Sequence, residues 1–363
     1  MTNPLTHLGD MPIETFLRDY WQKKPLLIRN AFPNFESPLD GDELAGLALE
    51  EEVESRLVLE NGKTPWELRN GPFDEETFAS LPETNWTLLV QAVDQWVPEV
   101  NLLLDNFRFI PNWRLDDIMI SFAPDKGSVG PHFDYYDVFL LQASGKRRWQ
   151  VGQRCDENSP LQNNEKIKLL QEFHTEQDYT LSTGDMLYLP AGVAHWGTAV
   201  GDDCITISIG FRAASHKEIV QAALENIAET LPNNQRYRDT KNSIDNDAFH
   251  INNSAVDNLM AIWKTLSDDD VRTALVQALG ELATEPRNAE REEPEESLGE
   301  KELIKKLASK NGLAVEHHPA SRFAWHKLDD ENADLYVDGG MLCTTPALAK
   351  AICHGSITAA VCN

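Results

Sequence analysis

The chain has 363 residues, of which 41% are hydrophobic, and it carries 59 acidic against 32 basic side chains, a formal net charge of −27. This length predicts two or three domains, and nine Trp and fourteen Phe supply ample core-forming material. The acidic excess argues against direct nucleic-acid binding and against docking on anionic membranes, because both need basic surfaces. It is compatible with a basic protein partner, or simply with solubility.

The cysteines and the N-terminus indicate the compartment. The five cysteines form no C-x-x-C pair and are odd in number, so the sequence suggests neither a disulfide framework nor a zinc site. The first twenty residues lack the basic start and apolar core of a signal peptide, and no apolar run approaches membrane-spanning length. We therefore expect a cytoplasmic protein without a membrane segment.

Residues 1–212 are predicted to form a first domain in which a helical and strand extension precedes a run of strands. Phe16, Leu17 and Tyr20 have helical spacing, and an apolar strand at 26–28 follows Pro25. Short apolar segments separated by Gly- and Pro-rich turns then predict strands at 117–123, 137–143, 147–151, 185–190 and 204–211. Such strands without intervening helices favour an antiparallel barrel or jelly roll.

Residues 213–280 have a helical pattern. Ser215 and Glu218 have the spacing of a capping box. One apolar face of the helix that follows is predicted to comprise Ile219, Val220, Leu224, Ile227 and Leu231. Segments 254–266 and 267–283 repeat the pattern, and these apolar faces must be covered by the barrel or by a second copy of the chain.

Residues 281–302 contain nine Glu against two Arg and one Lys, which is typical of an acidic solvated linker. Residues 303–363 then predict a small module with a helix at 303–312, strands within 322–328 and 334–346, and a helix from Ala347. The order of elements suggests a winged helix. Its balanced charge favours protein contact over duplex reading.

The run "GPHFDYYDVFLLQASGKRRWQVG" at 130–152 offers a candidate metal site. His132 and Asp134 lie two residues apart, so a strand would direct both to one face. The segment "GDMLYLPAGVAHWGTA" at 184–199 adds His195 after a turn. Two His and one carboxylate form the facial triad of non-haem Fe(II) oxygenases. The alternative for His195 is a core histidine satisfied within a turn.

A basic cluster follows the candidate metal site. Arg147 lies on the next predicted strand, and a cation inside a small barrel costs several kcal/mol unless it meets an anion. A guanidinium suits a carboxylate, which predicts an anionic co-substrate deeper in the barrel. Lys146 and Arg148 alternate with Arg147 and should face outward. Ser121 would either add a hydroxyl to that carboxylate or be a small core residue.

These two runs, together with "YWQKKPLLIRNAF" and "DDIMISFAP", resemble the JmjC (cupin-like) 2-oxoglutarate oxygenases. More narrowly, they resemble the bacterial ribosomal oxygenases that hydroxylate an arginine of large-subunit ribosomal protein sixteen. The resemblance extends over nearly the whole chain. It implies an α+β fold, with a double-stranded β-helix (jelly-roll) barrel, a helical dimerisation segment over 213–280 and a small winged-helix-like domain.

The resemblance also implies a chemistry. Fe(II) would be held by His132, Asp134 and His195, and the distal carboxylate of 2-oxoglutarate by Arg147 with Ser121. Oxygen would be the second co-substrate, with release of succinate and CO2. The implied partners are a basic ribosomal protein as substrate and a second copy of the chain.

The segments around the barrel mouth contain candidate substrate contacts, and the sequence leaves other functions open. An arginyl substrate would favour carboxylates or aromatic rings near the barrel mouth, and the candidates there are Asp125, Tyr135, Tyr136 and Asp137. One alternative keeps the fold but demethylates or hydroxylates another protein or RNA. A second is a metal cupin scaffold without 2-oxoglutarate turnover, although such cupins usually offer H-x-H and an added Glu. A third is a dimeric adaptor with a vestigial barrel.

Overall fold

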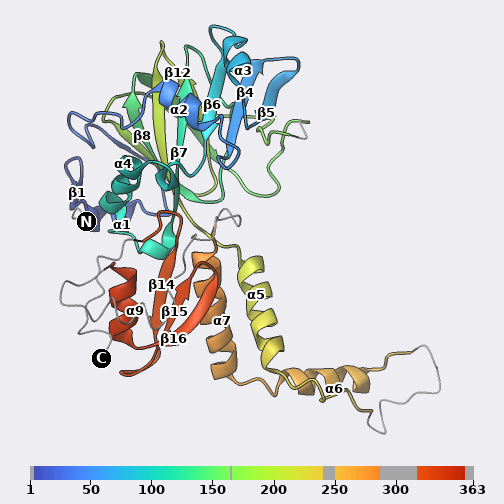
Figure 1. Ribbon diagram of the computed structural model, residues 1–363. Coiled ribbons are helices and arrows are strands. Elements are labelled where there is room, and N and C mark those ends of the chain that lie inside the picture. The colour runs from blue at the N-terminus through green and yellow to red at the C-terminus, as the bar shows by residue number, and fades with distance from the viewer. Residues whose placement is uncertain (1–3, 164–165, 240–249, 287–316, 356–363) are drawn as a thin grey trace, which may run out of the picture. The chain divides into compact units, whose positions relative to one another are not determined.

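The structure of this chain is a computed structural model, and it describes residues 4–163, 166–239, 250–286 and 317–355. The chain divides into two compact units, residues 1–213 and 214–363 (Figure 1). Within the described ranges, no helix is both long and apolar enough to cross a bilayer.

Two antiparallel sheets form the core of the first unit. The larger has eight strands in the order β3-β11-β8-β13-β7-β6-β4-β5, and the smaller has three in the order β10-β9-β12. The larger sheet comprises β3 (Leu26–Ile28), β4 (Ser55–Asn61), β5 (Pro65–Asn70), β6 (Trp86–Val90), β7 (Leu115–Ala123), β8 (Asp137–Ser144), β11 (Met186–Leu189) and β13 (Cys204–Phe211). The smaller comprises β9 (Lys146–Arg154), β10 (Thr175–Ser182) and β12 (Val193–Ala199).

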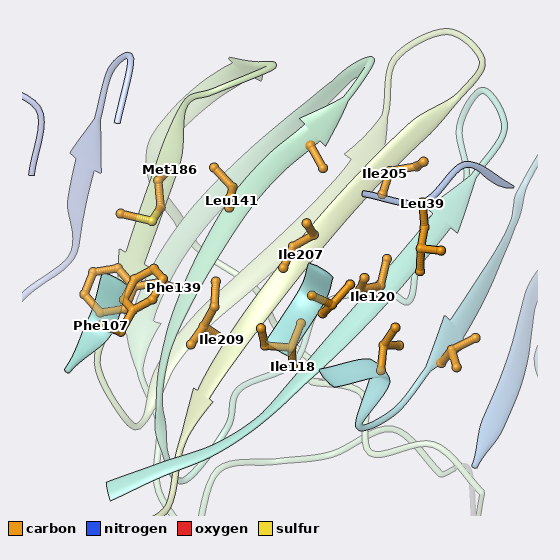
Figure 2. Packing of buried hydrophobic residues seen from close by; sticks show 14 of the residues in the cluster. Leu39, Phe107, Ile118, Ile120, Phe139, Leu141, Met186, Ile205, Ile207 and Ile209 are labelled. Carbon is orange, nitrogen blue, oxygen red and sulfur yellow. The ribbon is translucent and has the colours of Figure 1, made fainter. Parts of the chain in front are cut away.

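The central strand β13 is buried along its whole length, and its two faces serve different purposes. Ile205, Ile207 and Ile209 point to a large apolar cluster on the outer face of the sheet, together with side chains from β7, β8 and β11 (Figure 2). The alternate residues, Thr206 and Ser208, are buried on the opposite face. A strand that is covered on both faces has a nearly continuous run of apolar residues, and this run predicted β13 from the sequence.

The inner face of the larger sheet packs against the smaller sheet. Val138 and Leu140 of β8 share one buried cluster with Trp149 and Val151 of β9 and with Leu181 of β10. The space between the sheets also contains buried polar side chains, including Ser121, Gln142, Arg147, Thr206 and Ser208. Two closely packed sheets with a partly polar interior form the predicted jelly-roll barrel, open at the ends of its strands.

Short helices and one hairpin surround the larger sheet. They are α1 (Ile13–Asp19), α2 (Gly41–Leu47), α3 (Glu75–Ala79), α4 (Pro98–Asn101), the 3-10 helices η1 (Val93–Gln95), η2 (Leu102–Phe107) and η3 (Asn112–Arg114), and the hairpin β1–β2 (His7–Leu8 and Met11–Pro12). Phe16 of α1 is fully buried and packs edge-on against Tyr188 of β11, 4.9 Å between ring centroids. Such contacts cover the outer face of the barrel and leave its mouth to loops.

The second unit contains three helices and a small sheet. The helices are α5 (His216–Thr230), α6 (Asn253–Trp263) and α7 (Asp268–Thr284), and the sheet β14 (Phe323–Lys327), β15 (Ala333–Val337) and β16 (Gly340–Thr344) is followed by α9 (Pro346–Cys353). The capping box of Ser215 and Glu218 is confirmed. Helices α5 and α7 pack through Ala223, Ile227, Ala274 and Ala278.

Two details of the second unit bear on the sequence expectations. The last helix of the segment was predicted over 267–283, and α7 spans Asp268–Thr284. Its last turn is held because Thr284 Oγ1 donates to the Gly280 carbonyl (2.8 Å) and accepts from Gly339 N–H (3.1 Å). Val220 and Leu224 on α5, and Leu231 directly after it, are exposed, so part of the predicted apolar face is not covered by the described residues of this chain. The winged-helix interpretation stays a prediction, because residues 303–312 lie outside the described residues.

Candidate metal and co-substrate site

The two histidines come from segments that pair at the mouth of the barrel. His132 lies in the connection between β7 and β8, and His195 lies on β12 rather than in a turn. Their backbones exchange hydrogen bonds in both directions, at 3.1 and 2.8 Å, as in an antiparallel bridge. The imidazole rings are 4.2 Å apart between centroids. The bridge therefore places the two candidate ligand side chains side by side.

Each imidazole is oriented by a carbonyl two residues before it. Nδ1 of His132 lies 2.9 Å from the Gly130 carbonyl oxygen, and Nδ1 of His195 lies 3.0 Å from the Val193 carbonyl oxygen. Because a carbonyl only accepts, Nδ1 carries the proton in both rings and Nε2 keeps its lone pair. This arrangement is usual for histidines that bind a metal through Nε2.

Asp134 completes the cluster. Its Oδ2 lies 3.6 Å from His195 Nε2, and the ligand atoms of His132, Asp134 and His195 all lie within 4.8 Å of one another. The Asp134 carbonyl accepts from Gly192 N–H at 2.7 Å, which ties the carboxylate segment to the turn before β12. Gly192 has a left-handed backbone (φ +77°), and a Cβ there would approach the Cys155 carbonyl oxygen to 2.9 Å.

The electrostatics of the cluster favour metal binding. Burial, reinforced by the neighbouring His132, lowers the pKa of His195 to about 4, so its ring is neutral at physiological pH. Neutral imidazole is the ligating form, and Asp134 is partly exposed and acceptor-only. Two imidazoles and one carboxylate on one side of an ion fit the facial triad of a non-haem iron centre. The donors present therefore suit Fe(II).

Arg147 is placed where the sequence expected it. Its side chain is buried (3% exposed), whereas Lys146 and Arg148 on either side are exposed, and Arg148 pairs with Asp178 on the outside. Nε and Nη2 of Arg147 are buried and have no hydrogen-bond partner within the described part of the chain. A buried guanidinium with unsatisfied donors is costly, and a bound carboxylate would satisfy it.

Trp149 is a residue that the sequence reasoning missed. Its ring lies 5.6 Å from the Arg147 guanidinium and 5.8 Å from the His195 ring, measured to centroids. Its Nε1 is likewise buried without a partner among the described residues. Gly197 on β12 makes room for the indole, since a Cβ there would lie 2.6 Å from Cζ3. Unsatisfied donors on neighbouring inward positions fit an elongated anion with several acceptor oxygens, such as 2-oxoglutarate.

The remaining predicted site residues are placed less uniformly. Ser121 is buried on the inner face of β7 opposite Thr206, and its Oγ lies 3.5 Å from the Thr206 carbonyl oxygen. Tyr135 and Tyr136 are exposed beside the metal cluster. Asp125 is half-buried and accepts from Gly201 N–H at 2.8 Å.

Asp137 does not reach the barrel mouth. Its carboxylate is 1% exposed, accepts from Tyr188 Oη at 2.6 Å and lies 3.5 Å from Arg114 Nη2. The expectation that it contacts a substrate is therefore wrong, because distant segments enclose the carboxylate. Nothing near Asp137 in the sequence signals this enclosure.

A jelly-roll barrel with a His–Asp–His cluster at its mouth, and with a buried inward arginine whose Nε and Nη2 have no partner among the described residues, defines a cupin-like metal-dependent oxygenase fold. The JmjC domain profile matches residues 102–219, which contain all four of these site residues. A probable ribosomal oxygenase of Haemophilus influenzae is 46% identical over 200 residues, 55% of this chain and 49% of that protein. A ribosomal protein uL16 3-hydroxylase of Escherichia coli is 41% identical over 225 residues, 62% of this chain and 59% of that protein.

A solved structure extends the similarity to nearly the whole fold. YcfD, a ribosomal oxygenase from Escherichia coli in complex with cobalt and 2-oxoglutarate, superposes with a TM-score of 0.78 and 31% identity, covering 95% of this chain and 90% of that one. The chain belongs to the ribosomal oxygenase family of JmjC proteins. Its alignments with the two relatives above span about half to three-fifths of their lengths.

Proposed function

We propose that this chain is an Fe(II)- and 2-oxoglutarate-dependent protein hydroxylase that acts on an arginine of ribosomal protein uL16. The observation that carries the proposal is the pairing of the His132–Asp134–His195 cluster with the unsatisfied guanidinium of Arg147 inside one barrel. A metal cupin scaffold would have no use for that buried cation. The names of the family relatives, which include a uL16 3-hydroxylase, support the substrate.

The residues of the barrel would prepare the reaction. Arg147, with Ser121 and Trp149 Nε1, would hold the far carboxylate of 2-oxoglutarate, and the apolar side chains around Trp149 would exclude water from it. The Gly130 and Val193 carbonyls keep both histidines in the ligating tautomer. Bound Fe(II) would supply the oxidative chemistry, in which O2 and 2-oxoglutarate yield succinate, CO2 and a hydroxyl group on the substrate.

The barrel mouth offers groups that suit an arginyl side chain. Tyr135 is 61% exposed and packs edge-on against Phe133 at 5.2 Å, which gives a guanidinium an aromatic face near Asp134. Asp125 engages one carboxylate oxygen with Gly201, and a carboxylate retains lone pairs for a cation. We assign substrate contact to Asp125, Tyr135 and Tyr136. The net charge of −27 would speed encounter with a basic ribosomal protein, and a ribosomal substrate would be met in the cytoplasm.

We further infer that residues 213–280 mediate homodimerisation. Large apolar side chains remain exposed on all three helices of this segment, on α5 (Val220, Leu224), α6 (Val256, Leu259, Met260, Ile262, Trp263) and α7 (Leu275, Leu279). A shallow hollow on α5 is lined by Val220 and Leu224 and by the aliphatic stems of Lys217, Gln221 and Glu225. Apolar surface of this extent marks a protein interface, and a second copy would cover it.

The activity is tested by mass spectrometry of a uL16 peptide incubated with the protein, Fe(II), 2-oxoglutarate and air. We expect a gain of one oxygen on the arginine, absent without 2-oxoglutarate and absent in a peptide whose arginine is replaced by lysine. Succinate formation without oxygen gain would show a different substrate. Neither succinate nor oxygen gain would contradict the proposal and favour the scaffold alternative.

A further inference from the structure

Trp66 has a backbone conformation that is unusual for a strand. It lies within β5 with φ +55°, in the left-handed region, although it is not a glycine. For a bulky residue this conformation is unfavourable, because Cβ comes close to the backbone carbonyl oxygen. Residues held in sparsely populated conformations persist only where their surroundings fix them, and they concentrate at functional sites. The contacts of the Trp66 side chain therefore indicate what this conformation is for.

The indole of Trp66 reaches the segment that carries the first metal ligand. A Cβ built on Gly130 would lie 3.3 Å from Trp66 Cη2 and 2.7 Å from Leu169 Cδ2. The far edge of the indole and the buried Leu169 side chain thus meet at the Gly130 backbone. Gly130 has φ +80°, a conformation that favours glycine. Because glycine has no side chain, the Gly130 peptide can be held in place only by its neighbours.

Gly130 matters because its carbonyl orients His132. The two histidine segments differ in how they are held. His195 lies within β12, which pairs with β9 along its length, whereas His132 lies outside the named strands and joins one isolated bridge. The 128–132 segment is tied to β12 by Ser128 Oγ, which donates to the Gly197 carbonyl at 2.7 Å and accepts from Gly130 N–H at 3.0 Å. At Gly130, the three atoms nearest to a Cβ position belong to the side chains of Leu169 and Trp66.

The connection that carries Leu169 is itself attached to the ligand segment. Leu170 N–H donates to the Pro131 carbonyl at 2.9 Å, one residue before His132. Leu169 and Leu170 are 1% and 2% exposed, although they lie in the long connection between β9 and β10. Two distant parts of the chain, β5 and the β9–β10 connection, therefore contact the segment that leads to His132.

We propose that Trp66 is a positioning residue for the metal site, which together with Leu169 holds the Gly130 carbonyl and so fixes the orientation of His132. This inference rests on the proposed function, because it assumes that the triad binds a divalent metal. Partners that orient a ligating histidine typically contribute 10–100-fold to metal affinity. The strained backbone of Trp66 is then the consequence of aiming its indole at Gly130.

The test is titration of the metal-free protein with Co²⁺, followed by optical absorption or calorimetry at a temperature at which every variant is folded. Trp66→Gly removes the indole and also relieves the left-handed strain, so the backbone of β5 is not penalised. We expect Trp66→Gly and Leu169→Ala each to weaken Co²⁺ binding by about 10–100-fold. Trp96→Ala is the control, since it removes a partly exposed indole that follows η1 and is not among the atoms next to Gly130, and it should leave the affinity unchanged.

The outcomes separate this inference from the function on which it rests. His132→Ala should abolish Co²⁺ binding at the triad. If His132→Ala bound Co²⁺ as the wild type does, the triad would not be the metal site, and the proposed function would fail together with this inference. If His132→Ala lost binding while Trp66→Gly bound as tightly as the wild type, only the positioning role of Trp66 would be overturned.

Discussion

Strand β13 in the barrel and helix α5 in the second unit are both marked in the sequence by regular apolar residues. All eight residues of β13 are buried, with isoleucines on one face and smaller polar side chains on the other. On α5, Ala223 and Ile227 are buried, while Val220 is 53% exposed and Leu224 is 41% exposed. The same kind of signal thus leads to complete burial in one region and to incomplete burial in the other.

The difference shows which region buries its apolar side chains within a single chain. The barrel closes its core from its own strands and short helices, so the site at its mouth has all its ligands within residues 1–213. Between α5 and α7, the helices bury a narrow seam made of three alanines and Ile227. The apolar side chains that remain exposed on these helices support the proposed dimerisation of this segment. The barrel should therefore keep its metal site when the helices are disturbed, and the reverse should also hold.

The largest effect is expected from Asp134→Ala. It removes one of three metal ligands, so metal affinity and hydroxylation should fall by more than the 10–100-fold that loss of an orienting partner costs. Asp178→Ala, which removes a carboxylate paired with Arg148 on the outside of the barrel, is the control. Sedimentation should show an unchanged oligomeric state for both variants. A change in assembly with Asp134→Ala would break the independence of the two regions.

The next effect is expected from Leu224→Asp in the helical segment. An unpaired carboxylate buried in an apolar contact costs several kcal/mol, and each 1.4 kcal/mol is a factor of ten, so the dimer should dissociate at least about 100-fold more readily. Sedimentation velocity over a range of concentrations measures this, with Leu102→Asp, at an exposed position of the first unit, as control. Co²⁺ binding should not change. A variant that assembles as the wild type does would contradict dimerisation through α5.

Much of the fold was predictable because burial leaves a local trace. Strands β7, β8, β9, β11 and β13 lie where apolar alternation or continuous apolar runs predicted them. Strand β10 was missed because it is an exposed edge strand in which Leu181 is the one fully buried side chain. Strand β12 was missed because its sequence, VAHWGTA, follows a Pro–Gly turn and contains a glycine that exists to accommodate Trp149.

The site was predictable only where its residues lie close together in the sequence or follow a recognisable turn. The H-x-D pair and the turn before His195 carry the ligands, and the structure brings them together. The proposed support for those ligands comes from Trp66 and Leu169, which are 64 and 39 residues from Gly130 in the sequence, and no sequence pattern links such positions. Asp137 failed for the same reason, because its enclosure is made by Tyr188, Arg114 and Gln22.

Arg147→Met and Arg148→Met compare a buried arginine with an exposed one on the same strand, β9. Without the Arg147 guanidinium, the charge-assisted hydrogen bonds to 2-oxoglutarate, each about 1.5–3 kcal/mol, are lost, so KM for 2-oxoglutarate should rise by about 10–100-fold. Because the buried cation has unsatisfied donors in the protein alone, its replacement by a similar apolar side chain should raise the melting temperature measured without co-substrate. Arg148→Met, on the outside, should change neither quantity. A lower melting temperature for Arg147→Met would mean that the arginine serves packing rather than an anion.

The smallest effect is expected on the free energy of unfolding, from a Gly→Ala substitution at one packed and one unpacked helix position. Gly280 of α7 lies against Tyr336 of β15, and a Cβ there would approach the ring to 2.5 Å, whereas a Cβ at Gly46 of α2 would meet nothing within 4 Å. Alanine favours a helix by about 1 kcal/mol over glycine. Gly46→Ala should therefore stabilise the first unit by up to about 1 kcal/mol. Gly280→Ala should destabilise the second, because overpacking costs about 1–3 kcal/mol and outweighs that gain. Differential scanning calorimetry measures both, and a stabilising Gly280→Ala would show that α7 does not rest on the C-terminal sheet through this contact.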